Sequence, residues 1–324
     1  MASRHDWLSA AQTAKRDEFY TLYETVDAEL TLYKDELRGR PVVCPCDDRP
    51  GVSMFPRWFM DHMAELGTPR LTCLSYEPDV GSLFEKAPAM RWDLTPDGRR
   101  GPYSPADMTA TPLTSDGSLD SPDAVMLYST PGVVVASNPP FSLMRRFLGL
   151  MGSTGADFIV LGNLLAAAST EEGMRLLMAG RLRYGLSIHS GSTFFRIPDH
   201  YPRTATEVRD DGTVGVNSVR WLTSLKTAMA DKAWTPTGHT YAGHEADYPH
   251  YDTVDAIDVG SPSLIPDDWR GLMGVPVTIL DRWAPGAGGP RLAGRLSNGG
   301  GGTDVGAPLI GGRQTFLRLL LDAS

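Results

Sequence analysis

The residues with the clearest chemical potential form the tetrapeptide Asn138-Pro139-Pro140-Phe141, which directly follows a valine-rich run. The side-chain oxygen of Asn138 is a hydrogen-bond acceptor, and the backbone carbonyl of Pro139 is a second one. A proline has a fixed φ and no competing N–H donor, and it pushes the residue before it towards an extended conformation. Both acceptors are therefore held in place before a substrate arrives.

Two fixed acceptors suit an amine that is a poor nucleophile, such as the exocyclic N6 of adenine. Accepting both amine protons favours a pyramidal nitrogen with a localised lone pair, and preorganised groups of this kind are effective electrostatic catalysts. Phe141 can stack on a base that has been swung out of a duplex. A sulfonium methyl group is already activated, so this chemistry needs neither a metal nor a covalent intermediate. The alternative for the tetrapeptide alone is a proline-rich turn with Phe141 in the core.

Apolar runs that end on polar residues indicate the strands that would position this motif. Predicted strands cover residues 41–46, 70–76, 132–137 and 158–162. Asp47, Glu77 and Asn138 each follow one of them. In parallel α/β sheets the ligand lies beyond the carboxyl ends of the strands, so these three side chains are expected to share one site.

The segments between these runs indicate helices and loops. Helical periodicity over the first 40 residues or so places Phe19 and Leu37 on one apolar face. Helices are also predicted over residues 55–66 and 143–151, with a short one ending at 128. Residues 78–118 and the glycine-dense residues 284–312 are predicted loops, and the last strand is predicted at residues 315–319. Strands that alternate with helices predict an α/β protein with a parallel sheet covered on both faces.

Composition limits the classes of function. The chain has 324 residues and a net charge of −9, from 30 basic and 39 acidic side chains. That balance argues against a nonspecific nucleic-acid coat but allows one local basic cleft. Three cysteines form no disulfide framework, the N-terminus has no apolar signal segment, and no apolar run could span a membrane. We therefore expect a cytoplasmic protein without a membrane partner.

With the tetrapeptide and an acidic turn in place, the chain resembles the EcoRI-type adenine-specific DNA methyltransferases over most of its length. Four segments carry the resemblance: 15–21 (an entry motif), 43–48 (first strand and acidic turn), 137–142 (catalytic stretch) and 271–277. The resemblance implies a Rossmann-like class I sheet. It also implies methyl transfer from S-adenosylmethionine to N6 of a flipped-out adenine in double-stranded DNA.

The same resemblance implies roles in cofactor binding. Tyr20 and Thr21 would lie near the methionine part, and Asp47 would lie near the cofactor at the end of the first strand. Glu77 would take the ribose hydroxyls. The adenine would be held by Asp116, with Leu119 packed beside it. Residues after Asp47-Asp48 lack the usual Gly-x-Gly, which is tolerable because this cofactor has no phosphate to cradle; a turn aspartate at 116 and a solvated Glu77 are the alternatives.

The expected division is a cofactor-binding and catalytic core at residues 1–184 and a DNA-recognition region, with completion of the fold, at 185–324. Basic candidates for DNA contact are Arg145, Arg146, Arg196, Arg203, Arg209, Arg220 and Lys226, and Lys232 lies in the same basic region. Arg145 and Arg146 begin a predicted helix just after the motif, so they could hold phosphates that flank the target base. The alternative for any one of them is scattered surface charge.

Other functions stay open at this point. The same acceptors would serve a methyltransferase acting on an RNA base or a protein glutamine, and a noncatalytic DNA-binding protein could use the same fold. Cys44-x-Cys46 and Cys73 are interpreted as buried cysteines and not as metal ligands, and His239, His244 and His250 as surface residues. No obligate protein partner is evident. A functionally paired restriction endonuclease, solitary action and protection of viral DNA are all compatible with the sequence.

Overall fold

The computed structural model describes residues 19–78, 88–197 and 207–324 of the chain. They belong to two compact units, one formed by residues 1–163 and 186–225 and the other by residues 164–185 and 226–324. Residues 186–225 thus pack with the predicted catalytic core. The functional division at residue 184 is a separate matter and stays a prediction. None of the helices in the described ranges is long and apolar enough to cross a membrane.

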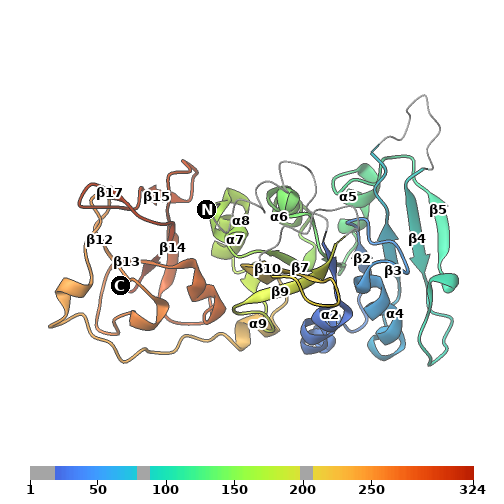
Figure 1. Ribbon diagram of the computed structural model, residues 1–324, viewed down its shortest axis with the longest axis horizontal. Helices are drawn as coiled ribbons and strands as arrows, with labels where there is room; N and C mark the ends of the chain where they lie inside the picture. The colour runs from blue at the N-terminus through green and yellow to red at the C-terminus, as the bar shows by residue number, and fades with distance from the viewer. Residues whose placement is uncertain (1–18, 79–87, 198–206) are drawn as a thin grey trace. The chain divides into compact units, whose positions relative to one another are not determined.

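A mixed sheet forms the centre of the first unit (Figure 1). The strands that the first unit contributes to this sheet follow the order β5-β4-β3-β2-β6-β7-β11. They are β2 (Val42–Cys44), β3 (Leu71–Leu74), β4 (Met90–Leu94), β5 (Thr109–Pro112), β6 (Val134–Ser137), β7 (Asp157–Asn163) and β11 (Val219–Thr223). The four strands from β3 to β7 in this order are parallel to one another, whereas β4, β5 and β11 are antiparallel to their neighbours. The predicted α/β class is confirmed at this level.

The parallel strands β2, β3 and β6 lie within the apolar runs that predicted them. All three are buried along their whole length, as strands covered on both faces are. Two details differ. The predicted loop at 78–118 contains β4 and β5, and β3 ends at Leu74, so Glu77 lies in the loop beyond the strand. The chain leaves β2 towards β3 on one side and leaves β6 towards β7 on the other. The crevice where strand order reverses therefore lies between β2 and β6.

Helices cover this sheet. They are α2 (Tyr23–Leu30), η1 (Thr31–Tyr33), α3 (Lys34–Leu37), α4 (Met54–Leu66), η2 (Pro105–Asp107), α5 (Pro122–Tyr128), η3 (Phe141–Leu143) and α6 (Met144–Thr154). Helix α2 packs on α4, and α5 packs on α6 (Figure 1). The predicted helix at 55–66 is confirmed: the Ser53 side chain caps its start, and Gly67, with φ of 61°, ends it.

A small antiparallel sheet also belongs to the first unit. It consists of β1 (Tyr20–Thr21), β9 (Ser192–Arg196) and β10 (Val214–Asn217), with Tyr20 opposite Arg196. Residues 20 and 21 are therefore strand, which corrects the expectation of continuous helix over the first 40 residues. The pairing gives Tyr20 and Thr21 a defined place beside a distant part of the chain.

The second unit is built around a sheet in the order β12-β13-β18-β14-β15. Its elements are α7 (Ala166–Ser169), α8 (Glu171–Met178), β8 (Arg183–Tyr184), α9 (Thr227–Ala230), η4 (Glu245–Asp247), β12 (Ala256–Asp258), η5 (Pro262–Leu264), β13 (Leu272–Val275), η6 (Val277–Asp281), β14 (Arg291–Leu296), β15 (Asp304–Gly306), β16 (Leu309–Ile310), β17 (Arg313–Gln314) and β18 (Arg318–Asp322). Part of its core is the cluster of Tyr251, Ala256, Leu296 and Leu320.

The glycine-dense segment is more ordered than predicted. Residues 291–296 form β14, and the buried side chain of Arg295 pairs with Asp304. Asp304 also accepts from the Gly301 N–H at 2.7 Å, which fixes the turn between β14 and β15. At Gly294, whose φ is 153°, a Cβ would lie 2.8 Å from the Thr303 carbonyl oxygen. The prediction of a loop over residues 284–312 was wrong for this part of the segment, because glycine here allows two strands to approach each other closely.

Candidate functional site

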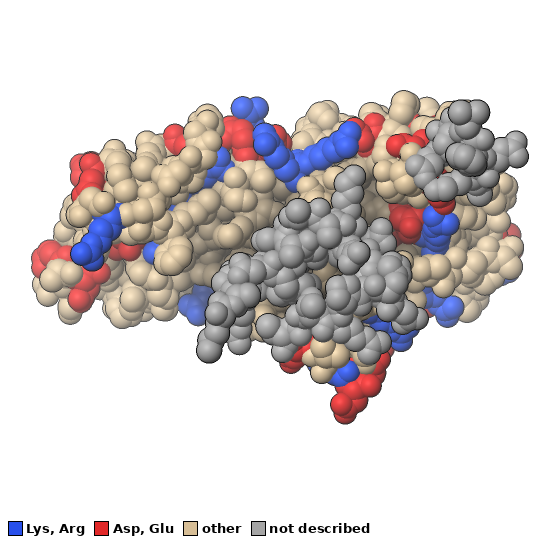
Figure 2. Space-filling model, turned by 45° about the horizontal axis from the view of Figure 1, so that its top comes forward, with Lys and Arg blue, Asp and Glu red and all other residues tan. Residues whose placement is uncertain are grey.

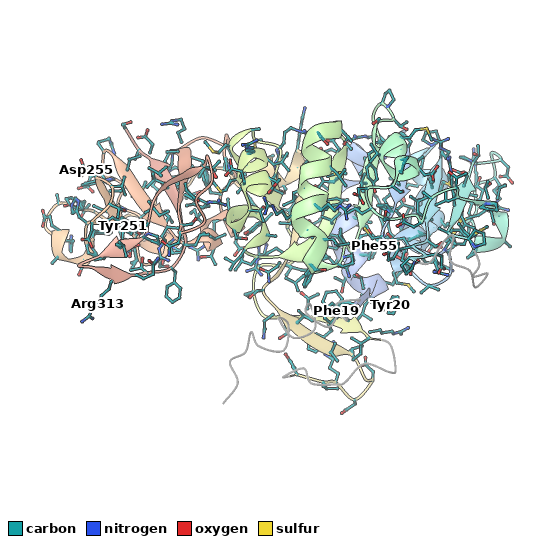
Figure 3. All side chains as sticks on the ribbon, turned by 90° about the horizontal axis from the view of Figure 1, so that it is seen from above. Phe19, Tyr20, Phe55, Tyr251, Asp255 and Arg313 are labelled. Carbon is teal, nitrogen blue, oxygen red and sulfur yellow. The ribbon has the colours of Figure 1, made fainter. Side chains whose placement is uncertain are left out.

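A cavity of about 360 Å³ opens in the first unit at the carboxyl ends of β2 and β6. This is the crevice that the strand order singles out, and the volume is in the range of small-molecule sites. Phe19, Tyr20 and Phe55, labelled in Figure 3, belong to its wall. The predicted site residues that line it are Tyr20, Thr21, Asp47, Leu119, Asn138 and Pro140.

Asn138 follows the last residue of β6 and lines this cavity. Its Nδ2 donates to the Phe19 carbonyl oxygen at 2.6 Å. Because that bond needs a donor, it fixes which end of the amide is nitrogen. The Oδ1 atom is buried and has no hydrogen-bond partner among the described residues. A buried acceptor without a partner is costly, so this arrangement suits a site completed by a ligand donor.

The other residues of the tetrapeptide differ in their surroundings. Pro140 lines the cavity, whereas Pro139 and Phe141 are not among its lining residues. Phe141 is 8% exposed, and its ring centroid lies 6.0 Å from that of Phe19, which in turn lies 5.6 Å from that of Phe195. Phe141 therefore belongs to an aromatic cluster beside the cavity, built from three distant segments.

Thr21 presents a second unpartnered polar atom. Its side chain is 6% exposed and lines the cavity, and Oγ1 has no hydrogen-bond partner in the described parts of the chain. Pairing of β1 with β9 holds this residue opposite Phe195. Thr21 and Asn138 thus give the cavity one hydroxyl oxygen and one amide oxygen that the described part of the chain leaves without a hydrogen bond.

An arginine bridges two of the predicted cofactor residues. Asp47 has a φ of 54°, a conformation that Asp tolerates better than most residues. Its Oδ1 accepts from Arg49 Nε at 2.8 Å, and Arg49 Nη2 donates to Glu77 Oε1 at 2.6 Å. The turn that lacks Gly-x-Gly is therefore closed by an Arg49 clamp. Glu77 does not line the cavity itself but lies next to Asp47 through this clamp.

Asp116 and Leu119 reach the site from the loop before α5. The Glu77 N–H donates to the Asp116 carbonyl oxygen at 2.9 Å, so two predicted acidic positions lie side by side. Asp116 is not among the cavity-lining residues, and its Oδ1 accepts from the Ser118 N–H at 2.9 Å, as a turn aspartate does. Leu119 is 5% exposed and lines the cavity.

Sequence reasoning assigned no role to Asp48, which the structure places in the cavity wall. Burial raises the pKa of Asp48 to about 6, against the opposing effect of hydrogen bonds from Ser137, Ser53 and the Cys46 N–H. The doubled aspartate after a predicted strand was the available signal. Which of the two carboxylates would be buried depended on the unusual backbone at Asp47, which no sequence pattern indicated.

The cysteines were interpreted as buried residues and the three histidines as surface residues, and the structure agrees for all of them except Cys46. Cys44 and Cys73 are buried, whereas Cys46 is only partly buried and lines the cavity. His239, His244 and His250 are exposed. Within the described ranges, no group of three metal-ligating side chains is found.

The basic candidates fall into different environments. Arg146 lines the cavity and pairs with Asp120. Arg196 is exposed, and Arg209 stacks on the Phe194 ring with 3.3 Å to its centroid. Arg220 is 5% exposed and donates to the carbonyl oxygens of Val219 and His189, so it is a structural residue and not a candidate for DNA contact.

Lys232 is also buried, with Nζ 3.1 Å from the Leu280 carbonyl oxygen. Arg203 and most of the predicted entry motif, residues 15–18, lie outside the described residues. Figure 2 shows basic side chains interspersed with acidic ones on the face that it displays. The local basic cleft that the charge balance allows, and the DNA contacts of the remaining basic candidates, stay predictions.

Comparison with known proteins gives the family. The family described as adenine-specific methyltransferase EcoRI matches residues 7–287. The type II methyltransferase M.MpnI of Mycoplasma pneumoniae is 33% identical over 285 residues, which cover 86% of this chain and 83% of that protein. M.EcoRI of Escherichia coli, also a type II methyltransferase, is 30% identical over 286 residues, 86% of each chain. No solved structure matches.

Proposed function

Since the chain belongs to the family of EcoRI-type adenine-specific methyltransferases, we propose that its cavity binds S-adenosylmethionine and receives an adenine swung out of double-stranded DNA. The protein is an adenine-specific DNA methyltransferase. The position methylated in this proposal is N6. The catalytic residues proposed are Asn138, Pro139, Pro140 and Phe141.

The observation that carries this proposal is the unpartnered Oδ1 of Asn138. Its Nδ2 is held by the Phe19 carbonyl, so Oδ1 is an acceptor that needs no rearrangement to receive an amine proton. The Pro139 carbonyl is proposed to accept the second proton. Together the two acceptors localise the nitrogen lone pair, and preorganised groups of this kind contribute on the order of 10²–10³ in rate each.

The residues around the cavity fit S-adenosylmethionine, which supplies an activated methyl group when bound. Thr21 Oγ1 is a buried hydroxyl that has no partner among the described residues and can bond the amino-acid part of the cofactor. Tyr20 is proposed to lie beside it. Asp47 and Glu77 supply carboxylates for the cofactor's ammonium and ribose groups, and the Arg49 clamp keeps them together. Asp116 and Leu119 are proposed to hold the adenine.

We also propose that this α/β unit has the Rossmann-like class I methyltransferase fold, and the strand order of its sheet supports this. Its cavity lies where the strand order reverses between β2 and β6, as expected for doubly wound sheets. The β4 and β5 pair extends that arrangement beyond β3, and the antiparallel β11 extends it beyond β7. Cofactor and target base would then meet at the carboxyl end of β6.

DNA contact is proposed at two places. In the first unit, Arg196 on β9 lies opposite Tyr20, a cavity residue, and Arg146 lines the cavity directly. Both can bind phosphates that flank the flipped base. In the second unit, the hairpin of β16 and β17 presents Arg313, which points away from that unit in Figure 3, followed by Phe316 at 80% exposure.

The hairpin has a fixed tip and a favourable charge. Asp252 accepts from the N–H groups of Gly311 and Gly312 at 3.0 and 2.7 Å. Arg313 on this hairpin is exposed, whereas the next arginine along the chain, Arg318, pairs with Asp258 at 3.0 Å, so the positive charge that the hairpin offers to DNA is that of Arg313. This hairpin is therefore our candidate for the recognition element. We also propose a functionally paired restriction endonuclease, since the similar proteins are named type II methyltransferases.

The test of the proposed function is methylation by the purified chain and by Asn138→Ala. Long-read sequencing of DNA from cells that express the wild type should show one methylated adenine motif. Tritiated methyl transfer to that motif should fall by about 10²–10³ in the variant. Near wild-type turnover in Asn138→Ala would reject the site, and absence of DNA methylation would direct attention to RNA bases or protein glutamines.

A further inference from the structure

A buried carboxylate lies beside the end of the catalytic strand. Asp48 is 4% exposed, and its Oδ2 accepts from Ser137 Oγ at 2.5 Å and from the Cys46 N–H at 3.2 Å. Its Oδ1 accepts from Ser53 Oγ at 2.6 Å. A carboxylate accepts about four hydrogen bonds, so protein donors use most of its capacity. Although Asp48 lines the cavity, its contacts are directed mainly at the protein.

Those contacts join three elements. Ser137 is the last residue of β6 and immediately precedes Asn138. Ser53 is the N-cap of α4, where its Oγ accepts from the Phe55 N–H at 3.4 Å. Asp48 itself belongs to the turn after β2. One carboxylate thus fixes the ends of two neighbouring parallel strands and the start of a helix at the rim of the cavity.

We infer that Asp48 is a positioning residue for methyl transfer, which acts through Ser137 to fix the end of β6 and so holds the Asn138 side chain towards the target amine. This inference rests on the proposed function. Asn138 is then held at two points: Nδ2 by the Phe19 carbonyl and the backbone by Ser137. A displacement of about 1 Å in such a group can lower a rate about 10²-fold.

A negative charge on Asp48 does not stabilise the fold. Burial favours the neutral acid, and the pKa of about 6 shows that the hydrogen bonds compensate for burial only in part. Asp47, on the same turn, raises the pKa of Asp48 further. The other groups that face it are Cys44, Cys46 and Tyr128, and burial raises the pKa of each of these. A neutral side chain would therefore serve the fold at least as well.

The first test compares two matched serines. Ser137→Ala removes the hydrogen bond to Asp48 without altering a residue of the cavity wall. Ser224→Ala removes a similar bond, from Ser224 Oγ to Asp157 Oδ1 at 2.8 Å, at the amino end of β7, and also the bond that Ser224 Oγ accepts from the Phe158 N–H at 2.9 Å, so it is the more disruptive of the two changes. We expect kcat to fall tenfold to a hundredfold in Ser137→Ala only, with KM for DNA within about threefold of wild type. Equal kcat in both variants would overturn the inference.

The second test uses the charge. Asp48→Asn keeps the shape but leaves one fewer acceptor, so kcat at pH 8 should also fall at least tenfold. The thermal unfolding temperature at that pH should be unchanged or higher, because a buried charge has been removed.

The pH dependence of kcat gives a further readout. The wild-type kcat should decline as the pH falls through about 6, and this decline should be missing in the variant. Parallel loss of activity and stability would indicate a structural role and overturn the inference. If Asp48→Asn fails to fold, the Ser137→Ala comparison decides.

A substrate-binding measurement separates this inference from the proposed function. DNA with 2-aminopurine at the target adenine should become equally fluorescent with wild type and Ser137→Ala, since base delivery does not need Ser137. If Asn138→Ala keeps normal turnover, the proposed site itself is wrong. If Asn138→Ala is inactive while Ser137→Ala has wild-type kcat, only the role of Asp48 is overturned.

Discussion

The backbone N–H of Glu77 donates to the backbone carbonyl of Asp116 at 2.9 Å, which brings together two acidic residues from separate loops. The first follows β3 and the second precedes α5. Glu77 is tied to Asp47 by the Arg49 clamp, so three predicted cofactor residues form one acidic edge beside the cavity. The three residues belong to separate segments of the sequence, so no single sequence motif predicts that they lie together.

Glu77→Ala and Asp116→Ala should each weaken S-adenosylmethionine binding. A charge-assisted hydrogen bond is worth about 1.5–3 kcal/mol, which corresponds to roughly a tenfold to hundredfold increase in the dissociation constant. Isothermal titration calorimetry measures this directly. The fully exposed Asp35 serves as the control, and Asp35→Ala should bind as wild type does. Unchanged affinity in both test variants would show that neither carboxylate contacts the cofactor.

Gly117 makes the approach of the two loops possible. A Cβ at this position would lie 2.0 Å from the Ser75 carbonyl oxygen. Gly132 has a similar positive φ, 72° against 68°, but no atom within 4 Å of a Cβ. Gly132→Ala should therefore cost about 1–2 kcal/mol of unfolding free energy from backbone strain alone, whereas Gly117→Ala should cost clearly more and also weaken cofactor binding. Urea unfolding and calorimetry on both variants test this, and equal losses would contradict it.

The parts of the fold that could be predicted are those with strong local signals. The buried parallel strands β2, β3 and β6 are uninterrupted apolar runs, which is how strands covered on both faces appear in sequence. The position of Asn138 followed directly from the run before it. In contrast, β5 is exposed along its length and ends in a proline, so it has the composition of a loop.

The parts that could not be predicted depend on distant pairing. A strand of two residues, Tyr20–Thr21, has no periodicity of its own and exists because β9 pairs with it. Arg220 is the type of residue that often contacts DNA. It is buried here because its guanidinium donates a hydrogen bond to the His189 carbonyl oxygen, which belongs to a distant part of the chain. The roles of Asp47 and Asp48 could not be separated either, because only the backbone at Asp47 decides which carboxylate is buried.

DNA binding should depend on salt through the proposed phosphate contacts. Each contact releases counterions and contributes about 0.9 to the slope of log affinity against log salt. Arg196→Ala should therefore reduce the slope by roughly that amount. Arg282→Ala, another exposed arginine, is the control and should keep the wild-type slope. Fluorescence anisotropy at several salt concentrations measures both, and a wild-type slope near zero would argue against DNA as the substrate.

The recognition hairpin predicts a different response. Arg313→Ala and Phe316→Ala should lower affinity for the methylated motif more than affinity for unrelated DNA, since base contacts specify sequence whereas phosphate contacts do not. Loss of one base contact is worth about 1–3 kcal/mol of discrimination. Competition binding with motif and scrambled duplexes checks this. Equal losses on both duplexes would show that the hairpin contacts only the backbone or does not contact DNA.

Asp48 should make stability depend on pH in an unusual direction. Its folded-state pKa of about 6 lies above the unfolded value of about 3.9, so the folded state binds the proton more tightly. That stabilisation is fully present below pH 4 and is lost as the pH rises to 6. Relative to Asp48→Asn, the wild type should lose on the order of 2 kcal/mol of unfolding free energy between pH 4 and 7.

Urea unfolding at pH 4, 5, 6 and 7 measures this difference for the wild type and the variant. Asp107→Asn is the control, because the side-chain hydrogen bond from Arg99, followed by those from Ser104, lowers the pKa of Asp107 to about 2. Its contribution to stability is present above the unfolded pKa of about 3.9 and is lost as the pH falls through about 2, so its difference from wild type should stay flat from pH 5 to 7. A flat difference for Asp48→Asn as well would mean that Asp48 titrates normally and is not held as a buried charge beside the catalytic strand.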